Sequence, residues 1–229
     1  PILTSDITGL GTLRILDSLR EHAPNAKFYQ ASSSEMFGNI TGIHDEKSRF
    51  QPRSPYGVAK VFSHHMTNHY REAYDIFACC GTLFNHESPL RGIEFVTRKI
   101  TYNLALVKHK KIKKFSLGNI KAKRDWGFAE DYVEAMWMML QQKEPDNYVV
   151  ATGESHSVEE FLNLAVEYAE MGDWHDFIEI SEKDMRPTDI DDLIGNASYA
   201  KEKLNWESKT SFKELVKLMV EHDLNMFKL

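Results

Sequence analysis

Apolar positions follow two spacings that alternate along the chain. A near-continuous apolar run, typical of a parallel strand buried on both faces, predicts a strand at 76–84, and further strands are predicted at 28–31, 113–117, 148–151 and 177–180. Apolar residues three and four apart predict amphipathic helices at 9–20, 55–74, 95–108, 128–142, 158–170, 198–204 and 212–226. Strands that alternate with helices indicate βαβ units and a parallel sheet, so the predicted fold class is α/β.

Helix start signals support these boundaries. Ser54 can cap the helix that begins at Pro55, a residue suited to the first helical position. Capping boxes are predicted for two later helices: Ser157 with Glu160, and Ser211 with Glu214. The methionine-rich run 136–140 predicts a largely buried helix segment.

Polar side chains follow two of the predicted strands. Ser32, Ser33, Ser34 and Glu35 end the first strand, at the sheet edge where open α/β sheets bind ligands. A second polar cluster, 85–92, follows the run 76–84. This second cluster fits a ligand site, but it equally fits a turn with a helix cap.

Tyr56 and Lys60 are four residues apart and therefore share one face of the predicted helix. An ammonium beside a phenol favours the phenolate, which lowers the tyrosine pKa and suits proton transfer. The same spacing also occurs in surface pairs without function. The polar strand end upstream favours the chemical interpretation.

Composition narrows the class of protein. The chain of 229 residues is 42% hydrophobic and 27% charged, as in ordinary globular proteins. Its net charge of -6 argues against a general nucleic-acid binder, and the basic run 108–114 is interpreted as a solvated helix end and loop. No apolar run approaches the ~18 residues of a transmembrane helix, and no signal peptide is visible. We expect no membrane partner.

Cysteine and histidine positions add two expectations. Cys79 and Cys80 are adjacent in an apolar run, which predicts buried thiols and a reducing, cytoplasmic compartment. His65 and His69 have a spacing that could hold zinc, but a third ligand is lacking. We therefore interpret these two histidines and His64 as a solvated helix face and expect no metal.

Three segments carry a family resemblance. Gln-Ala-Ser-Ser-Ser-Glu (30–35), Pro-Arg-Ser-Pro-Tyr-x-x-x-Lys (52–60) and Asn-His-Glu-Ser-Pro-x-Arg-Gly (85–92) resemble the GDP-mannose 4,6-dehydratase family of extended short-chain dehydrogenases/reductases. Ser33 stands where the family has threonine, which keeps the hydroxyl. The resemblance covers nearly the whole chain.

The resemblance implies an incomplete Rossmann-like parallel sheet with a smaller C-terminal substrate lobe. No Gly-x-Gly-x-x-Gly precedes Gly9, so the first strands and the glycine-rich loop of the family are expected to be absent. The implied domains are a truncated NADP-binding domain at 1–153, with 86–118 also lining the substrate site, and a nucleotide-sugar-binding lobe at 154–229.

The resemblance also implies roles for individual residues. Tyr56 would act as base on the sugar 4-hydroxyl with help from Lys60, Glu35 would remove the C5 proton, and Ser33 would hydrogen-bond the 4-oxygen. The implied NADP contacts are Tyr56, Lys60, His86 and Arg91. The implied substrate contacts are Ser34, Asn85, Val96, Lys99, Leu117, Gly118, Arg124, Arg186 and Asp189.

The implied function is that of a lyase: NADP-dependent dehydration of GDP-mannose to GDP-4-keto-6-deoxymannose by a homodimer or homotetramer. Residues that distinguish NADP from NAD are not in the chain. Three alternatives stay open: a GDP-manno-heptose 4,6-dehydratase, another nucleotide-sugar epimerase or reductase, and an inactive binding or regulatory subunit. An epimerase shares the Tyr-Lys pair but has no need of Glu35.

Overall fold

The computed structural model describes residues 1–185 and 193–228. Its longer helices are α2 (Gly11–His22), α3 (Pro55–Tyr74), α4 (Val96–Lys108), α5 (Ala129–Gln141), α6 (Val158–Tyr168), α7 (Ser198–Leu204) and α8 (Phe212–Met226). Its short helices are α1 (Ile2–Thr4), η1 (Ser5–Leu10), η2 (Ser34–Met36), η3 (Trp174–Asp176) and η4 (Glu182–Asp184).

The strands form one three-stranded sheet and several two-stranded pairs. The strands are β1 (Phe28–Ser33), β2 (Ile43–His44), β3 (Ala78–Leu83), β4 (Asn85–Glu87), β5 (Phe115–Leu117), β6 (Lys123–Arg124), β7 (Trp126–Phe128), β8 (Asn147–Val150), β9 (His156–Ser157), β10 (Ile178–Ile180) and β11 (Ile194–Gly195). The main sheet has the order β1-β3-β8 with both pairings parallel. The predicted α/β class with a parallel sheet is confirmed.

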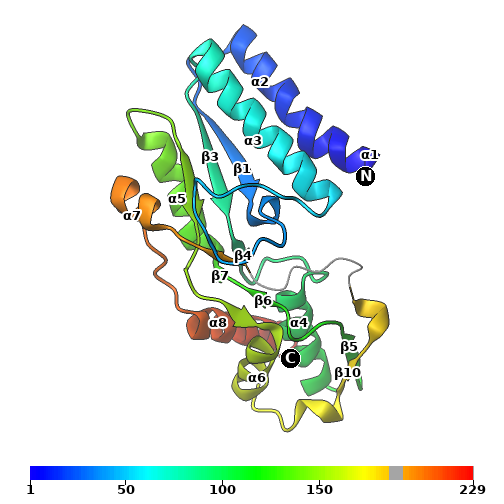
Figure 1. Cartoon of the computed structure of the whole chain (residues 1–229). Helices are drawn as coiled ribbons and strands as arrows, with labels where there is room; N and C mark the ends of the chain where they lie inside the picture. Colours follow the sequence, from blue (N-terminus) through cyan, green and yellow to red (C-terminus); the bar gives the residue numbers. More distant parts are fainter. Residues whose placement is uncertain (186–192, 229) are drawn as a thin grey trace.

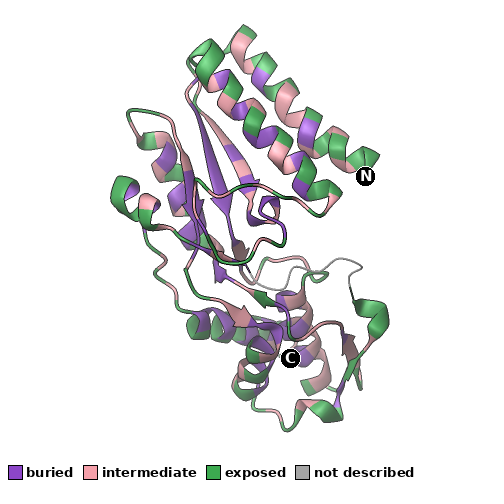
Figure 2. Cartoon of the chain, viewed as in Figure 1, coloured by how far each residue is buried: buried purple, intermediate pink, exposed green. Residues whose placement is uncertain are grey.

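Helices cover both faces of the main sheet, with α2 and α3 on one side and α5 on the other (Figure 1). Every residue of the central strand β3 is buried (Figure 2). Its side chains alternate between two apolar clusters: Ala78 packs with Leu16 and Tyr70, whereas Cys79 packs with Tyr132. This double coverage explains why the strand is mostly apolar.

A second core lies in the lower part of the molecule in Figure 1 and is built from α4, α6 and α8. Its buried residues come from chain segments far apart in sequence, and they include Ile100, Phe161, Phe212 and Met219. The parallel pair β5–β10 flanks this core. The predicted domain ranges 1–153 and 154–229 stay a prediction. The cores cross that boundary, since α4 belongs to the lower core and α7 packs against the upper one.

Local sequence signals located most helices well. The predicted bounds of α3 agree with the structure, Ser54 caps it, and both capping boxes are present. The first helical segment is longer than predicted: it begins at Ile2 and passes through the π-helical turn η1. The two glycines at 9 and 11 have low helix propensity, which concealed this continuation.

Burial on α5 differs from the prediction. Met139 is fully buried, but Trp137 is 63% exposed. Successive helical residues are rotated by about 100°, so a run of five apolar residues goes around the whole helix and cannot face one core. Elsewhere, Cys79 and Cys80 are buried free thiols, as predicted. Within 1–185 and 193–228, no helix is both long and apolar enough to cross a membrane.

A buried ion pair joins α8 to α4. The Asp223 carboxylate is fully buried and receives hydrogen bonds from Arg98 Nε at 2.9 Å and Thr101 Oγ1 at 2.6 Å. Arg98 also donates to the carbonyls of Pro89 and Arg91. The lower core is thereby attached to the loop that follows β4.

We expect Asp223→Ala to lower the free energy of unfolding by about 3–5 kcal/mol, because Arg98 would stay buried without its counter-charge. Urea unfolding measures this change. The control is Glu221→Ala, which removes an exposed contact with Lys217 and should change the free energy by less than about 1 kcal/mol. Equal losses in the two variants would contradict the prediction.

Candidate active site

A cavity of about 830 Å³ lies between the two cores, at the carboxyl ends of β1 and β3. Its wall contains every predicted site residue that the structure describes. These are Ser33, Ser34, Glu35, Tyr56, Lys60, Asn85, His86, Arg91, Val96, Lys99, Leu117, Gly118 and Arg124. Arg186 and Asp189 lie outside the described residues. The structure thus brings the candidates together, while their individual roles stay predictions.

The end of β1 supplies the first polar groups. Ser33 ends the strand, and its Oγ accepts a hydrogen bond from Glu35 N at 3.3 Å, which starts the short helix η2. Ser34 is buried. Glu35 is half-buried, and its Oε2 accepts a hydrogen bond from Ser54 Oγ at 3.1 Å. The carboxylate is therefore held at the strand end by the residue that caps α3.

Tyr56 and Lys60 project from the first two turns of α3. The Ser33 hydroxyl lies near the Tyr56 phenol and acts to lower its pKa. Lys60 Nζ lies 5.5 Å from the centre of the Tyr56 ring and donates to Ala31 O at 2.7 Å. The structure thus joins the two predicted elements, the strand end and the helix, through direct contacts.

The pKa of Tyr56 differs from the sequence expectation. Burial raises the pKa of the Tyr56 phenol and the nearby Glu35 carboxylate adds to the rise, whereas the Ser33 hydroxyl and Arg91 oppose it. Burial lowers the pKa of Lys60. The Tyr56 pKa is therefore raised rather than lowered as expected, because burial outweighs the groups that favour the phenolate.

The polar cluster after β3 begins as a short strand and continues as a turn, in which Arg91 N donates to Ser88 O. β4 pairs in parallel with β7, and His86 lies opposite Gly127. His86 Nδ1 is 2.9 Å from Phe84 O, and the ring stacks on Tyr132. Burial lowers the pKa of His86, so the imidazole is neutral. The carbonyl contact then requires the proton on Nδ1, which leaves Nε2 as an acceptor for a ligand.

Arg91 is held in place by a buried carboxylate. Arg91 Nε lies 3.2 Å from Glu87 Oε2, and the guanidinium lies over the Phe95 ring at 3.6 Å. Glu87 is 2% exposed and also accepts a hydrogen bond from Thr97. Burial raises the pKa of Glu87, whereas Arg91 lowers it. Sequence reasoning missed Glu87 as a site residue, although it belongs to the 85–92 cluster.

The lower wall of the cavity carries Lys99 on α4. Lys99 Nζ pairs with Asp184 Oδ1 at 3.2 Å, and Ser116 Oγ donates to Asp184 Oδ2 at 2.6 Å. Gly118 lies against the same segment, since a Cβ there would be 2.4 Å from Asp184 O. No sequence pattern indicates Asp184 as a site residue. Its carboxylate already binds the lysine that is expected to meet the substrate diphosphate.

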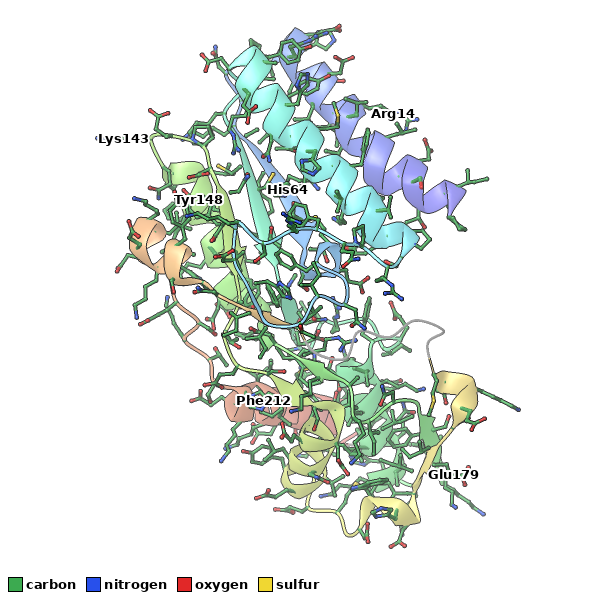
Figure 3. All side chains as sticks on the ribbon, viewed as in Figure 1. Arg14, His64, Lys143, Tyr148, Glu179 and Phe212 are labelled. Carbon is green, nitrogen blue, oxygen red and sulfur yellow. The ribbon has the colours of Figure 1, made fainter. Side chains whose placement is uncertain are left out.

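The histidine interpretation is wrong at one position. His64 is 5% exposed, and its Nδ1 lies 2.9 Å from Ser32 Oγ. Figure 3 shows it between α3 and the sheet. His65 and His69 are exposed, as expected. Within the described ranges, no three His, Cys, Asp or Glu side chains group as metal ligands.

A parallel sheet whose Ser-Glu strand end faces a Tyr-x-x-x-Lys helix is the arrangement of the extended short-chain dehydrogenases/reductases. Two solved structures share the fold. RMD from Pseudomonas aeruginosa complexed with NADPH has a TM-score of 0.87 at 21% identity and covers 97% of this chain and 74% of its own. dTDP-glucose 4,6-dehydratase from Bacillus anthracis in complex with NAD has a TM-score of 0.85 at 21% identity. The match covers 95% of this chain and 68% of the dTDP-glucose 4,6-dehydratase chain.

The family model for GDP-mannose 4,6 dehydratase matches residues 1–219, and the chain belongs to this family. GDP-mannose 4,6 dehydratase 1 of Arabidopsis thaliana is 52% identical over 100% of this chain and 64% of its own length. The human GDP-mannose 4,6 dehydratase is 45% identical, and the match covers 98% of this chain and 66% of the human protein. The chain therefore spans less than two thirds of these relatives.

His64 makes stability depend on pH. Burial lowers its pKa from 6.5 to about 4, so between these values the unfolded chain binds a proton that the folded chain does not. The His64 contribution to stability is therefore constant above pH 6.5 and falls as pH falls towards 4, by about 3 kcal/mol at ~1.4 kcal/mol per pKa unit.

We expect His64→Gln, which keeps a hydrogen-bonding group near Ser32, to remove this part of the pH dependence. Urea unfolding at a series of pH values between 4 and 7 measures it. His65→Gln is the matched control at an exposed neighbour, and it should keep the dependence because the buried imidazole is still present. A wild-type curve identical to that of His64→Gln would contradict the assignment.

Proposed function

We propose that the protein containing this chain dehydrates GDP-mannose to GDP-4-keto-6-deoxymannose. The observation that carries the proposal is the position of Glu35. Its carboxylate shares one cavity with Ser33 and Tyr56 and is hydrogen-bonded to the cap of the Tyr56 helix. A Tyr-Lys pair suffices to oxidise C4, but elimination across C5 and C6 needs a second acid/base group.

The described residues fit the nicotinamide end of a dinucleotide. Two cations, Lys60 and Arg91, together with the Tyr56 hydroxyl and a neutral His86, offer partners for ribose hydroxyls and phosphate oxygens. NADPH and NAD are bound by similarly folded proteins, and we propose NADP here. When bound, this cofactor accepts a hydride from the sugar and returns it.

Tyr56 is the proposed base for the sugar 4-hydroxyl. The phenolate must accept the proton, and the Ser33 hydroxyl and the Arg91 guanidinium both favour it against burial. Ser33 is placed to hydrogen-bond the same sugar oxygen. Lys60 holds the helix to Ala31 O at 2.7 Å and presents its charge at the cofactor ribose.

Glu35 is the proposed acid/base for elimination. A ketone at C4 acidifies the C5 proton, so the Glu35 carboxylate takes that proton while the C5–H electron pair enters the enolate. The C6–O bond then breaks, and the proton on Glu35 joins the leaving hydroxyl to give water. Ser34 assists at the strand end.

The lower wall is the proposed nucleotide site. Lys99 and Arg124 provide positive charge for the diphosphate, and Leu117 and Gly118 line the part of the cavity proposed for guanine. The proposal extends to Asn85 and Val96 at the sugar, and to Arg186 and Asp189 at the nucleotide ribose. A GDP-manno-heptose substrate would use the same groups. Comparing the two sugars in one assay, with product detected by NMR, distinguishes them.

We also propose a homo-oligomer in the cytoplasm. Between Pro55 and Tyr70 the helix α3 carries a single formally charged side chain, Lys60, while Val58 and Phe62 are 55% and 38% exposed. An exposed helix face that is apolar and nearly uncharged suits contact with a second copy. The two buried free thiols fit a reducing compartment.

Tyr56→Phe should abolish oxidation at C4, with a loss of ~100-fold or more, because the phenol is the positioned base. The measurement is turnover of GDP-mannose by the whole protein. Tyr74→Phe is the matched control: it changes a tyrosine at the other end of the same helix and should leave the rate unchanged. A wild-type rate in the Tyr56→Phe variant would disprove the role of Tyr56.

Glu35→Gln should separate oxidation from elimination, because the amide keeps the shape but cannot take the C5 proton. On meeting GDP-mannose, the variant should give the absorbance of reduced cofactor without 4-keto-6-deoxy product. Exchange of the C5 proton with deuterated water, followed by NMR, should be lost. Normal product and normal exchange would instead favour an epimerase or reductase.

A further inference from the structure

Ser54 makes two hydrogen bonds that point in different directions. Its Oγ accepts from Gly57 N at 3.0 Å, which caps α3, and donates to Glu35 Oε2 at 3.1 Å. A serine hydroxyl has one proton to donate and two lone pairs to accept with. The cap therefore uses the acceptor side, and the only proton goes to the carboxylate.

Glu35 depends on this contact. Among the described residues, no other side chain hydrogen-bonds the Glu35 carboxylate. Oε2 is thus bound to Ser54, whereas Oε1 is left for a ligand in the cavity. At 3.1 Å this hydrogen bond is a moderate one, and it determines which carboxylate oxygen faces Ser54.

The backbone keeps the two residues at a short distance. A Cβ added at Gly57 would lie 2.9 Å from Glu35 O and 3.4 Å from Ser54 Oγ. The first turn of α3 is therefore in van der Waals contact with the turn that carries Glu35. Since Tyr56 lies two residues after Ser54, one helix start positions both groups.

We propose that Ser54 is a positioning residue for the elimination step: it orients Glu35 so that Oε1 faces the C5 proton. The inference rests on the proposed dehydratase function. It assigns no contact between Ser54 and the sugar. It predicts that loss of the Ser54 proton affects Glu35 but not Tyr56.

The decisive variant is Ser54→Asp. Aspartate caps helices as well as serine does, but when ionised it cannot donate a proton, and its charge repels Glu35. Misplacing a reacting group by about 1 Å can cost ~100-fold in rate, so we expect at least about 10-fold slower C5 exchange and product formation. Formation of reduced cofactor should fall by less than C5 exchange, because the added carboxylate also disfavours the Tyr56 phenolate, and KM for GDP-mannose should stay within about 2-fold of wild type.

Two further variants complete the set. Ser54→Thr keeps the cap and the proton, and it should restore C5 exchange to within about 3-fold. Ser211→Asp is the matched control, because Ser211 also caps a helix and donates to a glutamate, Glu214, at 2.6 Å. This control lies on α8 and should leave both steps unchanged.

The outcomes are distinct. Wild-type C5 exchange in Ser54→Asp, or equal loss of cofactor reduction and exchange, would overturn the positioning role, since the second result describes general damage to the helix start. Failure of Ser54→Thr to restore exchange would overturn it too. A different result would show that the proposed dehydratase function is incorrect: the wild-type protein itself would neither exchange the C5 proton nor form product.

Discussion

The attachment of α3 to β1 is the constraint on which the site depends. Lys60 donates to Ala31 O at 2.7 Å, and His64, one turn later, contacts the Ser32 hydroxyl at 2.9 Å. The next residue of the strand, Ser33, lines the same cavity as Tyr56 and acts to lower the pKa of the Tyr56 phenol. Because the contacts involve consecutive strand residues, a shift of the helix by one residue would separate the phenol from Ser33 and Glu35.

Local patterns predict the elements well, whereas contacts between distant segments cannot be predicted from them. The Ser54 cap and the bounds of α3 follow from neighbouring residues, and so does the burial of β3. The pairing of Lys99 with Asp184 joins residues 85 positions apart, and no spacing rule encodes such a contact. The burial of His64 escapes prediction for the same reason, because its partner Ser32 lies on another element.

Burial of charge is the recurring energetic feature. Glu87 and Asp223 are almost inaccessible to water, and each is matched by an arginine that also contacts the backbone or an aromatic ring. A buried pair contributes little net stability compared with apolar residues, but losing one partner is costly. Such pairs therefore hold the paired side chains, and the backbone that carries them, in one arrangement. Here both pairs converge on the 89–91 loop, since Arg98 binds the carbonyl of Arg91 and Glu87 binds its side chain.

The two walls of the cavity differ in how firmly their charges are held. Glu87 is buried with its arginine, whereas the side chains of Lys99 and Asp184 are 29% and 31% exposed. Partly exposed ion pairs contribute at most about 1 kcal/mol, so an anionic diphosphate can displace Asp184 from Lys99 at small cost. The proposed chemistry takes place at the opposite wall, around Ser33, Glu35 and Tyr56, and it requires fixed geometry. The proposed nucleotide site at the lower wall requires only that one anion replaces another at Lys99.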